Sequence, residues 1–171
     1  MKLLGAILIM TAASLGGVLL LREKKQRQDG YRSLAAALEL LRGELSSGGI
    51  PLDLGIERAY THAKGIGKAF LSTVRDGFHD LGEHSFEEIW DKALADTCPW
   101  LALDTQAEIR KIGGELGRFD LELQLRFLDA CISYLKEQWQ LQRSTYPSDR
   151  RVTLVLSFSL SALLVILLYL K

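Results

Sequence analysis

Two uncharged apolar segments, one at each end of the 171-residue chain, restrict its folding more than any other feature. Residues 3–21 and 152–170 each run for nineteen residues without a charged side chain. About 20 apolar residues are enough for a helix to cross the ~30 Å hydrocarbon core of a bilayer. The sequence therefore predicts an N-terminal transmembrane helix at 1–21 and a C-terminal one at 152–171. Residues 22–151 form a domain between them, long enough to bury its own core.

Charges beside the two segments predict the orientation of the chain. The flanking basic residues are Arg22, Lys24, Lys25, Arg27, Arg143, Arg150 and Arg151. Because basic flanks stay on the cytoplasmic side, we expect residues 22–151 in the cytoplasm and both termini outside. Cleavage of the first segment as a signal peptide is the alternative, since Lys2 and the small residues at 11–14 also fit that pattern. In a reducing cytoplasm Cys98 and Cys131, which form no CxxC pair, are expected as free thiols.

Apolar residues recur every three or four positions through the domain, which is the spacing of amphipathic helices. The longest stripes are Tyr31, Leu34, Leu38, Leu41, Leu45 and Leu121, Leu125, Leu128, Ile132, Leu135, Trp139. Shorter stripes lie between them, and no useful stretch alternates with the two-residue period of a strand. The sequence therefore predicts an all-α cytoplasmic bundle of about six helices, flanked by the two transmembrane helices.

Local signals locate several helix starts. Ser85 and Glu88 form an S-x-x-E capping box, which predicts a helix that begins near Phe86. Thr105 and Glu108 form a second such pattern, which predicts the start of the fifth helix. Pro51 suits the first turn of the second helix.

A glycine-rich stretch, RKIGGELGRFDLELQ at residues 110–124, separates the last two predicted helices. Glycine costs a helix interior about 1 kcal/mol relative to alanine, so its use here needs a reason. We place Gly113 in the last turn of the fifth helix, Gly117 just past it with a positive φ, and Asp120 at the N-cap of the sixth. One interpretation is a tight corner that lets another helix approach closely. The other adds a partner-binding surface formed by Gly113, Gly117, Asp120 and Gln124.

The corner sequence IGGELGRFDLELQ, residues 112–124, resembles the L-G-x-x-L-G-x-x-D-x-x-x-Q pattern of the stage III sporulation protein AB family of endospore-forming bacteria. Ile112 in place of the first leucine is the one departure. The two terminal spans also match, so the resemblance covers essentially the whole chain. That family is similar to the cytoplasmic domain of the F-type inner-membrane platform protein of type II secretion and type IV pilus machines.

This resemblance implies a component of a channel-like complex between mother cell and forespore, in the mother-cell membrane around the forespore. The partners it implies are a cytoplasmic secretion-type ATPase and other membrane components of the same complex. Small residues four apart in the spans, Ala13 with Gly17 and Ser157 with Ser161, also allow transmembrane helices to touch, so a homo-oligomer is an open expectation.

Patterns that carry catalytic, cofactor or metal chemistry are missing from the sequence. His62, His79 and His84 have no metal-ligand spacing, and no P-loop motif occurs. Gly65-Ile66-Gly67 lacks the third glycine of a dinucleotide loop. Cys98 would act as a nucleophile only beside a histidine and an acid in space. We therefore expect no enzyme activity, no cofactor and no metal.

Charge further limits the partners. Between residues 76 and 91 there are six acids and no Lys or Arg, namely Asp76, Asp80, Glu83, Glu87, Glu88 and Asp91. A solvated face and a docking face for a basic partner are the two interpretations. The domain's net charge of −2 disfavours nucleic acid, and the basic flanks of the spans suit anionic lipid.

The predicted function is that of a non-enzymatic membrane scaffold, which couples an ATPase to a secretion-like assembly across the envelope. A small two-span channel or holin-like protein is one alternative, and it would need polar pore-lining residues where the spans offer Thr, Ser and Gly. A membrane-anchored enzyme of unknown class is the other, and it would need titratable groups gathered around a pocket.

Overall fold

The computed structural model describes residues 25–47, 49–116, 120–143 and 159. Residues 29–139 form one compact unit, and residues 1–28 with 140–171 form a second. The predicted membrane segments lie outside the described residues, apart from residue 159. Within the described part of the chain, no helix combines the length and the apolar character needed to cross a membrane.

Regular structure in the described residues is helical throughout. A first long helix (residues 25–46) is followed by α2 (Leu52–His62), α3 (Gly65–Gly77), the short 3-10 helix η1 (Phe78–Asp80), α4 (Phe86–Thr97), α5 (Leu103–Glu115) and a last long helix (residues 121–143). An isolated bridge between Leu81 and His84 is the one extended pairing among these residues. The six α-helices confirm the predicted all-α fold.

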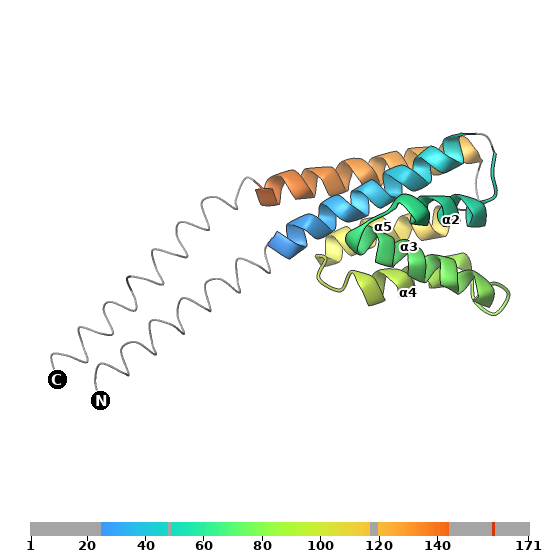
Figure 1. Cartoon of the computed structure of the whole chain (residues 1–171), viewed down its shortest axis with the longest axis horizontal. Coiled ribbons are helices and arrows are strands. Elements are labelled where there is room, and N and C mark those ends of the chain that lie inside the picture. The colour runs from blue at the N-terminus through green and yellow to red at the C-terminus, as the bar shows by residue number, and fades with distance from the viewer. Residues whose placement is uncertain (1–24, 48, 117–119, 144–158, 160–171) are drawn as a thin grey trace, which may run out of the picture. The chain divides into compact units, whose positions relative to one another are not determined.

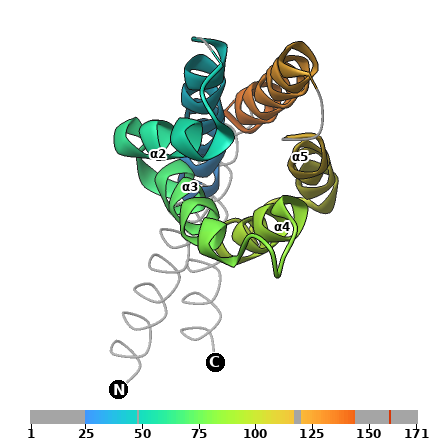
Figure 2. The same ribbon diagram turned by 90° about the vertical axis from the view of Figure 1, so that its right-hand side faces the viewer.

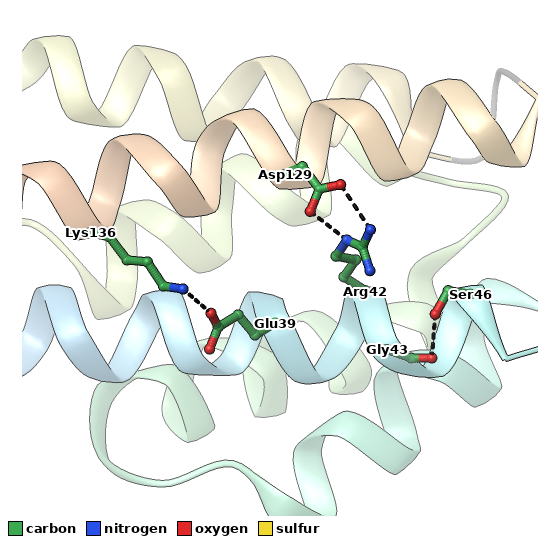
Figure 3. Close-up of polar contacts among 6 residues, drawn as sticks. All are labelled: Glu39, Arg42, Gly43, Ser46, Asp129 and Lys136. Carbon is green, nitrogen blue, oxygen red and sulfur yellow. Dashed lines mark hydrogen bonds and ion pairs between the residues drawn. The ribbon is translucent and has the colours of Figure 1, made fainter.

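The six helices of residues 29–139 form a ring around one core. Packing joins α2 to α3, α3 to α4 and α4 to α5, and the last long helix returns beside the first (Figures 1 and 2). Two ion pairs join the long helices: Arg42 binds Asp129 through Nε and Nη2, and Lys136 binds Glu39 (Figure 3). Because residue 39 faces residue 136 while 42 faces 129, the long helices are antiparallel. Both ends of this unit therefore lie at the same end of the bundle.

The core consists of the predicted apolar stripes. Tyr31, Leu34, Leu38, Leu41 and Leu45 are all buried, which confirms the stripe on the first long helix. The last long helix contributes Leu128, Ile132 and Leu135 to the core, with Leu121, Leu125 and Trp139 packed at its edge. Full burial of a large aliphatic side chain contributes roughly 1.5–3 kcal/mol, so these stripes supply the main attraction between the helices.

The predicted helix starts had different outcomes. Ser85 caps α4 through a complete capping box: Glu88 N donates to Ser85 Oγ at 3.3 Å, and Ser85 N donates to Glu88 Oε2 at 2.9 Å. The prediction at Thr105 was wrong, because α5 begins at Leu103 with Ala102 as its N-cap. Thr105 points into the core with 1% exposure, and Glu108 binds Lys111 at 2.5 Å instead. Pro51 is the N-cap of α2, one residue before the position we expected.

A serine on the first long helix anchors the start of α3. Ser33 Oγ donates to the Lys64 carbonyl at 2.6 Å and accepts from Gly67 N at 2.9 Å. A Cβ atom at residue 67 would collide with the Ser33 carbonyl oxygen, so only glycine allows this approach. This contact fixes where α3 crosses the first long helix.

Candidate protein-interaction site

The predicted corner joins α5 to the last long helix. α5 ends at Glu115, and Leu116 follows with extended backbone at φ −65° and ψ 128°. The Asp120 carbonyl accepts from Gln124 N at 3.1 Å, as the carbonyl of an N-cap residue does. Asp120 therefore occupies the position that the sequence predicts. Gly117 lies outside the described residues, so its positive φ stays a prediction.

Gly113 is a point of close contact between α4 and α5. A Cβ atom at residue 113 would lie 2.6 Å from Trp90 Cδ1, closer than packed side chains allow. Trp90 is fully buried, and its Nε1 donates to the Ile109 carbonyl at 2.9 Å, which holds the ring in place. The expected close approach of a second helix is confirmed at Gly113, and the approaching helix is α4.

The candidate residues that the structure describes differ in exposure. Gly113 is buried, Asp120 is exposed and Gln124 is half-buried. Gly113 therefore lies in the buried part of the corner, whereas Asp120 and Gln124 lie where a partner could contact them. Their role in binding stays a prediction.

A small apolar hollow, which we call the corner groove, opens beside Gly113. Its volume is about 230 Å³. Its apolar lining consists of Leu52, Phe78, Leu81, Phe86, Gly113 and Leu116, and Ser85 and Glu87 line it as well. Sequence reasoning missed this groove because its walls come from α2, η1, α4 and α5. The one available signal was the set of large apolar residues, Phe78, Leu81 and Phe86, inside the acidic stretch.

Aromatic rings connect the corner groove to the core. The centroids of Phe78 and Phe86 lie 5.7 Å apart, and those of Phe86 and Trp90 lie 5.8 Å apart. Trp90 in turn meets Phe70 edge-to-face at 4.7 Å and 89°. The aromatic lining of the groove therefore packs against fully buried side chains of the core.

A second, more polar groove of about 540 Å³ lies along α3 and α4. Its carboxylates are Asp76, Asp80, Glu88 and Asp96, joined by His84 and Lys92. The predicted acidic stretch therefore faces two ways: Glu88 lines this groove, and Glu87 lines the corner groove. The pKa of Glu88 lies below its ordinary value, chiefly because its carboxylate accepts the backbone hydrogen bond from Ser85.

Both cysteines are free, as predicted, and both are buried. Burial raises the pKa of the Cys131 thiol to about 12 and also raises that of Cys98. A thiol with a raised pKa carries little thiolate at neutral pH and reacts slowly. Among the described residues, no group of three or more His, Cys, Asp or Glu side chains is arranged to hold a metal ion.

One carboxylate, that of Asp91 on α4, has a buried oxygen and an ion pair with Arg110 on α5. Asp91 Oδ1 is buried and accepts no hydrogen bond from the described residues. Burial raises the pKa of Asp91, and the Arg110 guanidinium, whose Nε lies 3.9 Å from Oδ2, partly offsets this. The two side chains are 40% and 48% exposed, and neither lines either groove.

Comparisons with known proteins give one consistent result. The sequence profile described as "Stage III sporulation protein AB" matches residues 2–169. The protein named "Stage III sporulation protein AB" from Bacillus subtilis (strain 168) is 27% identical over 173 residues, which cover 98% of this chain and 99% of that protein. A solved structure of "Stage III sporulation protein AB (SpoIIIAB)" has a TM-score of 0.61 at 20% identity. It covers 71% of this chain and 97% of that one, and so supports the fold.

Proposed function

The chain belongs to the stage III sporulation protein AB family, and from this premise we propose that it is a non-enzymatic membrane platform of a secretion-like complex in endospore formation. The observation that carries the proposal is the extent of the family match, residues 2–169. The match includes both uncharged terminal segments together with the helical bundle. A protein that works through all three parts is better described as a membrane-held scaffold than as a free domain.

The arrangement of residues 29–139 suits such a scaffold. Both ends of this unit lie at one end of the bundle, as expected of a domain whose two ends lead to the same membrane. The corner between α5 and the last long helix lies at the opposite end. We propose a cell-membrane protein with its bundle in the cytoplasm, on the mother-cell side by family resemblance. Its spans would contact other membrane components of the complex or a second copy.

We propose the corner as the docking point for a cytoplasmic secretion-type ATPase. Asp120 is exposed there, Gln124 lies one helical turn further along, and the close contact of Gly113 with Trp90 supports the backbone behind them. The described residues also favour binding over bond chemistry. Both thiols are buried with raised pKa values, and the Ser85 hydroxyl in the corner groove is engaged in the α4 cap.

Co-purification tests this proposal. The full chain, wild type or Asp120→Asn, is incubated with the candidate ATPase at low and at high salt. Asparagine caps a helix as well as aspartate does, so the fold is kept while the charge is lost. We expect the variant to recover less ATPase at low salt, where a charge pair is least screened. Asp29→Asn, an exposed residue at the other end of the bundle, is the matched control.

Two outcomes would contradict the proposal. Equal recovery by wild type and Asp120→Asn at both salt concentrations would make the corner a purely architectural feature. Failure of the wild-type chain to recover the ATPase at either concentration would remove the ATPase from the proposal.

A further inference from the structure

We propose that the corner groove binds a short peptide segment of a protein partner, in which one large apolar residue is flanked by Lys or Arg. This proposal rests on the proposed scaffold function, because it specifies the chemistry of the partner that the corner would receive. It adds an apolar anchor site to a surface for which the sequence predicted only polar contacts.

The size and lining of the groove indicate a single anchor side chain. Ligand sites that enclose a whole small molecule usually have volumes of about 300–1,000 Å³, and the corner groove has about 230 Å³. Its lining residues Phe78 and Phe86 are apolar and pack against each other, and Leu81, which also lines it, is 47% exposed. A well-packed apolar pocket is the setting in which one buried residue can supply most of the binding energy of an interface.

Exposed apolar residues gather at the same end of the bundle. Four large apolar residues are exposed among the described residues of 29–139, namely Leu54, Leu81, Leu103 and Leu123. Leu54 lies in the first turn of α2, Leu81 follows η1 and Leu123 lies in the first turn of the last long helix, so three of the four lie at the end of the bundle that carries the corner. Leu103, at the start of α5, is at the opposite end.

The charge around the groove selects a basic partner. The described segments at this end that follow the first long helix are residues 49–55, 76–88, 113–116 and 120–124. They contain nine Asp and Glu residues and no Lys or Arg, with His79 and His84 as their other titratable groups. Asp76 and Glu122 pair with Arg75 and Arg126, which lie just outside these segments, and Arg118 of the corner sequence lies outside the described residues. The nine acids still outnumber these three arginines, so the charge at this end is negative. A segment with Lys or Arg beside its anchor gains attraction, whereas an acidic segment or an anionic lipid surface is repelled. Two copies that met through this end would place like charges together, which disfavours self-association here.

Synthetic peptides test the proposal on the full chain in detergent micelles. The probe is a fluorescein-labelled peptide with one leucine flanked by lysines. One control peptide replaces the leucine with alanine, and the other replaces the lysines with glutamates. From fluorescence anisotropy we expect the lysine-leucine peptide to bind at least about tenfold more tightly than either control, a factor equivalent to ~1.4 kcal/mol.

Matched protein variants assign the binding to the groove. Leu81→Asp places a charge on the exposed groove wall and should weaken binding about tenfold or more. Leu103→Asp makes the same change at a leucine with 84% exposure at the opposite end and should leave binding unchanged. Glu87→Gln removes one carboxylate from the groove and should weaken binding mainly at low salt, whereas Glu137→Gln, exposed on the last long helix, should not.

Several results would overturn the inference. Equal binding of the alanine peptide would show attraction by charge alone, and equal effects of Leu81→Asp and Leu103→Asp would place the peptide elsewhere. A dimer of the wild-type chain that Leu81→Asp converts to a monomer would make a second copy the occupant. Specific peptide binding without ATPase recovery would support the groove and contradict the proposed ATPase. ATPase recovery without peptide discrimination would contradict the groove alone.

Discussion

The contact between Gly113 and Trp90 shows how one missing side chain shapes the corner. Glycine is a poor helix former, yet Gly113 lies inside the last turn of α5. The Trp90 ring fills the space that a Cβ atom would take, and its Nε1–H bond to the Ile109 carbonyl prevents it from moving aside. The cost in helix propensity is therefore offset by burial of the largest side chain in the core.

Substitution of neighbouring glycines tests this account. Gly113→Ala should destabilise the bundle by roughly 1–3 kcal/mol, because overpacking displaces a fixed ring. Gly114→Ala is the matched control, because its Cβ would lie 3.5 Å from the Glu87 carboxylate, which is an ordinary contact. This variant should be more stable than the wild type by up to about 1 kcal/mol, since alanine favours a helix more than glycine does. Urea unfolding of both variants, followed by tryptophan fluorescence, measures the difference. Similar midpoints would mean that Trp90 has room to shift.

Among the helices, the two predicted capping boxes had opposite outcomes for a spatial reason. Ser85 follows an exposed loop, so its side chain was free to turn back onto the α4 backbone. Thr105 faces the core, and its backbone N–H instead donates to Asp104 Oδ1 at 2.7 Å. A capping sequence therefore defines a helix start only where the surrounding helices leave its first residue at the surface.

The α4 cap should make stability depend on pH. The folded-state pKa of Glu88 lies below its ordinary value of 4.5. The stability that its carboxylate contributes to the folded state is therefore fully present above pH 4.5. This stability is lost as the pH falls through the lower pKa that Glu88 has in the folded state. Glu88→Gln keeps an oxygen that accepts from Ser85 N, and should unfold with a weaker pH dependence between about pH 5 and 3. The pH dependence is measured from the midpoint of thermal unfolding across that range, with Glu83→Gln in the adjacent loop as the control.

At the scale of the whole bundle, the ring is closed by the two long helices. The Arg42–Asp129 pair that joins them has side-chain exposures of 38% and 52%, so solvent screens it strongly. The apolar stripes beneath it therefore supply most of the attraction, and the ion pairs mainly fix the register of the two helices (Figure 3).

A double-mutant cycle at this seam tests its role. Arg42→Ala, Asp129→Ala and the double variant should show a small favourable coupling energy in low salt, and high salt should reduce it. The more exposed Arg126–Glu122 pair within the last long helix should show a weaker coupling, since a bidentate guanidinium–carboxylate contact is the stronger kind. A coupling that is unaffected by salt would contradict this description of the seam.

The orientation of the whole chain is tested with reporter fusions. We expect a phosphatase that is active only outside the cytoplasm to be active when fused after Lys171 and inactive at Gly49, because the basic flanks of both segments favour the cytoplasmic side. Immunoblots should confirm equal expression of the two fusions. Activity at Gly49, or inactivity after Lys171, would refute the predicted topology.

The sequence by itself determined the features that depend on neighbours along the chain. The 3-and-4 spacing of Leu34, Leu38 and Leu41 defines a buried helix face in any all-α arrangement, and the Ser85 cap and the place of Asp120 follow from equally local rules. Composition also predicts that the terminal segments are separate from the bundle.

Only the tertiary structure decided which helices meet. The corner groove exists because Leu52, Phe78 and Leu116, from three distant parts of the chain, converge at one end of the bundle. Likewise, Ser33 caps a helix that begins over thirty residues later, and Trp90 makes Gly113 necessary. Such contacts depend on packing between helices, and local periodicity says which face of a helix is buried but not what covers it.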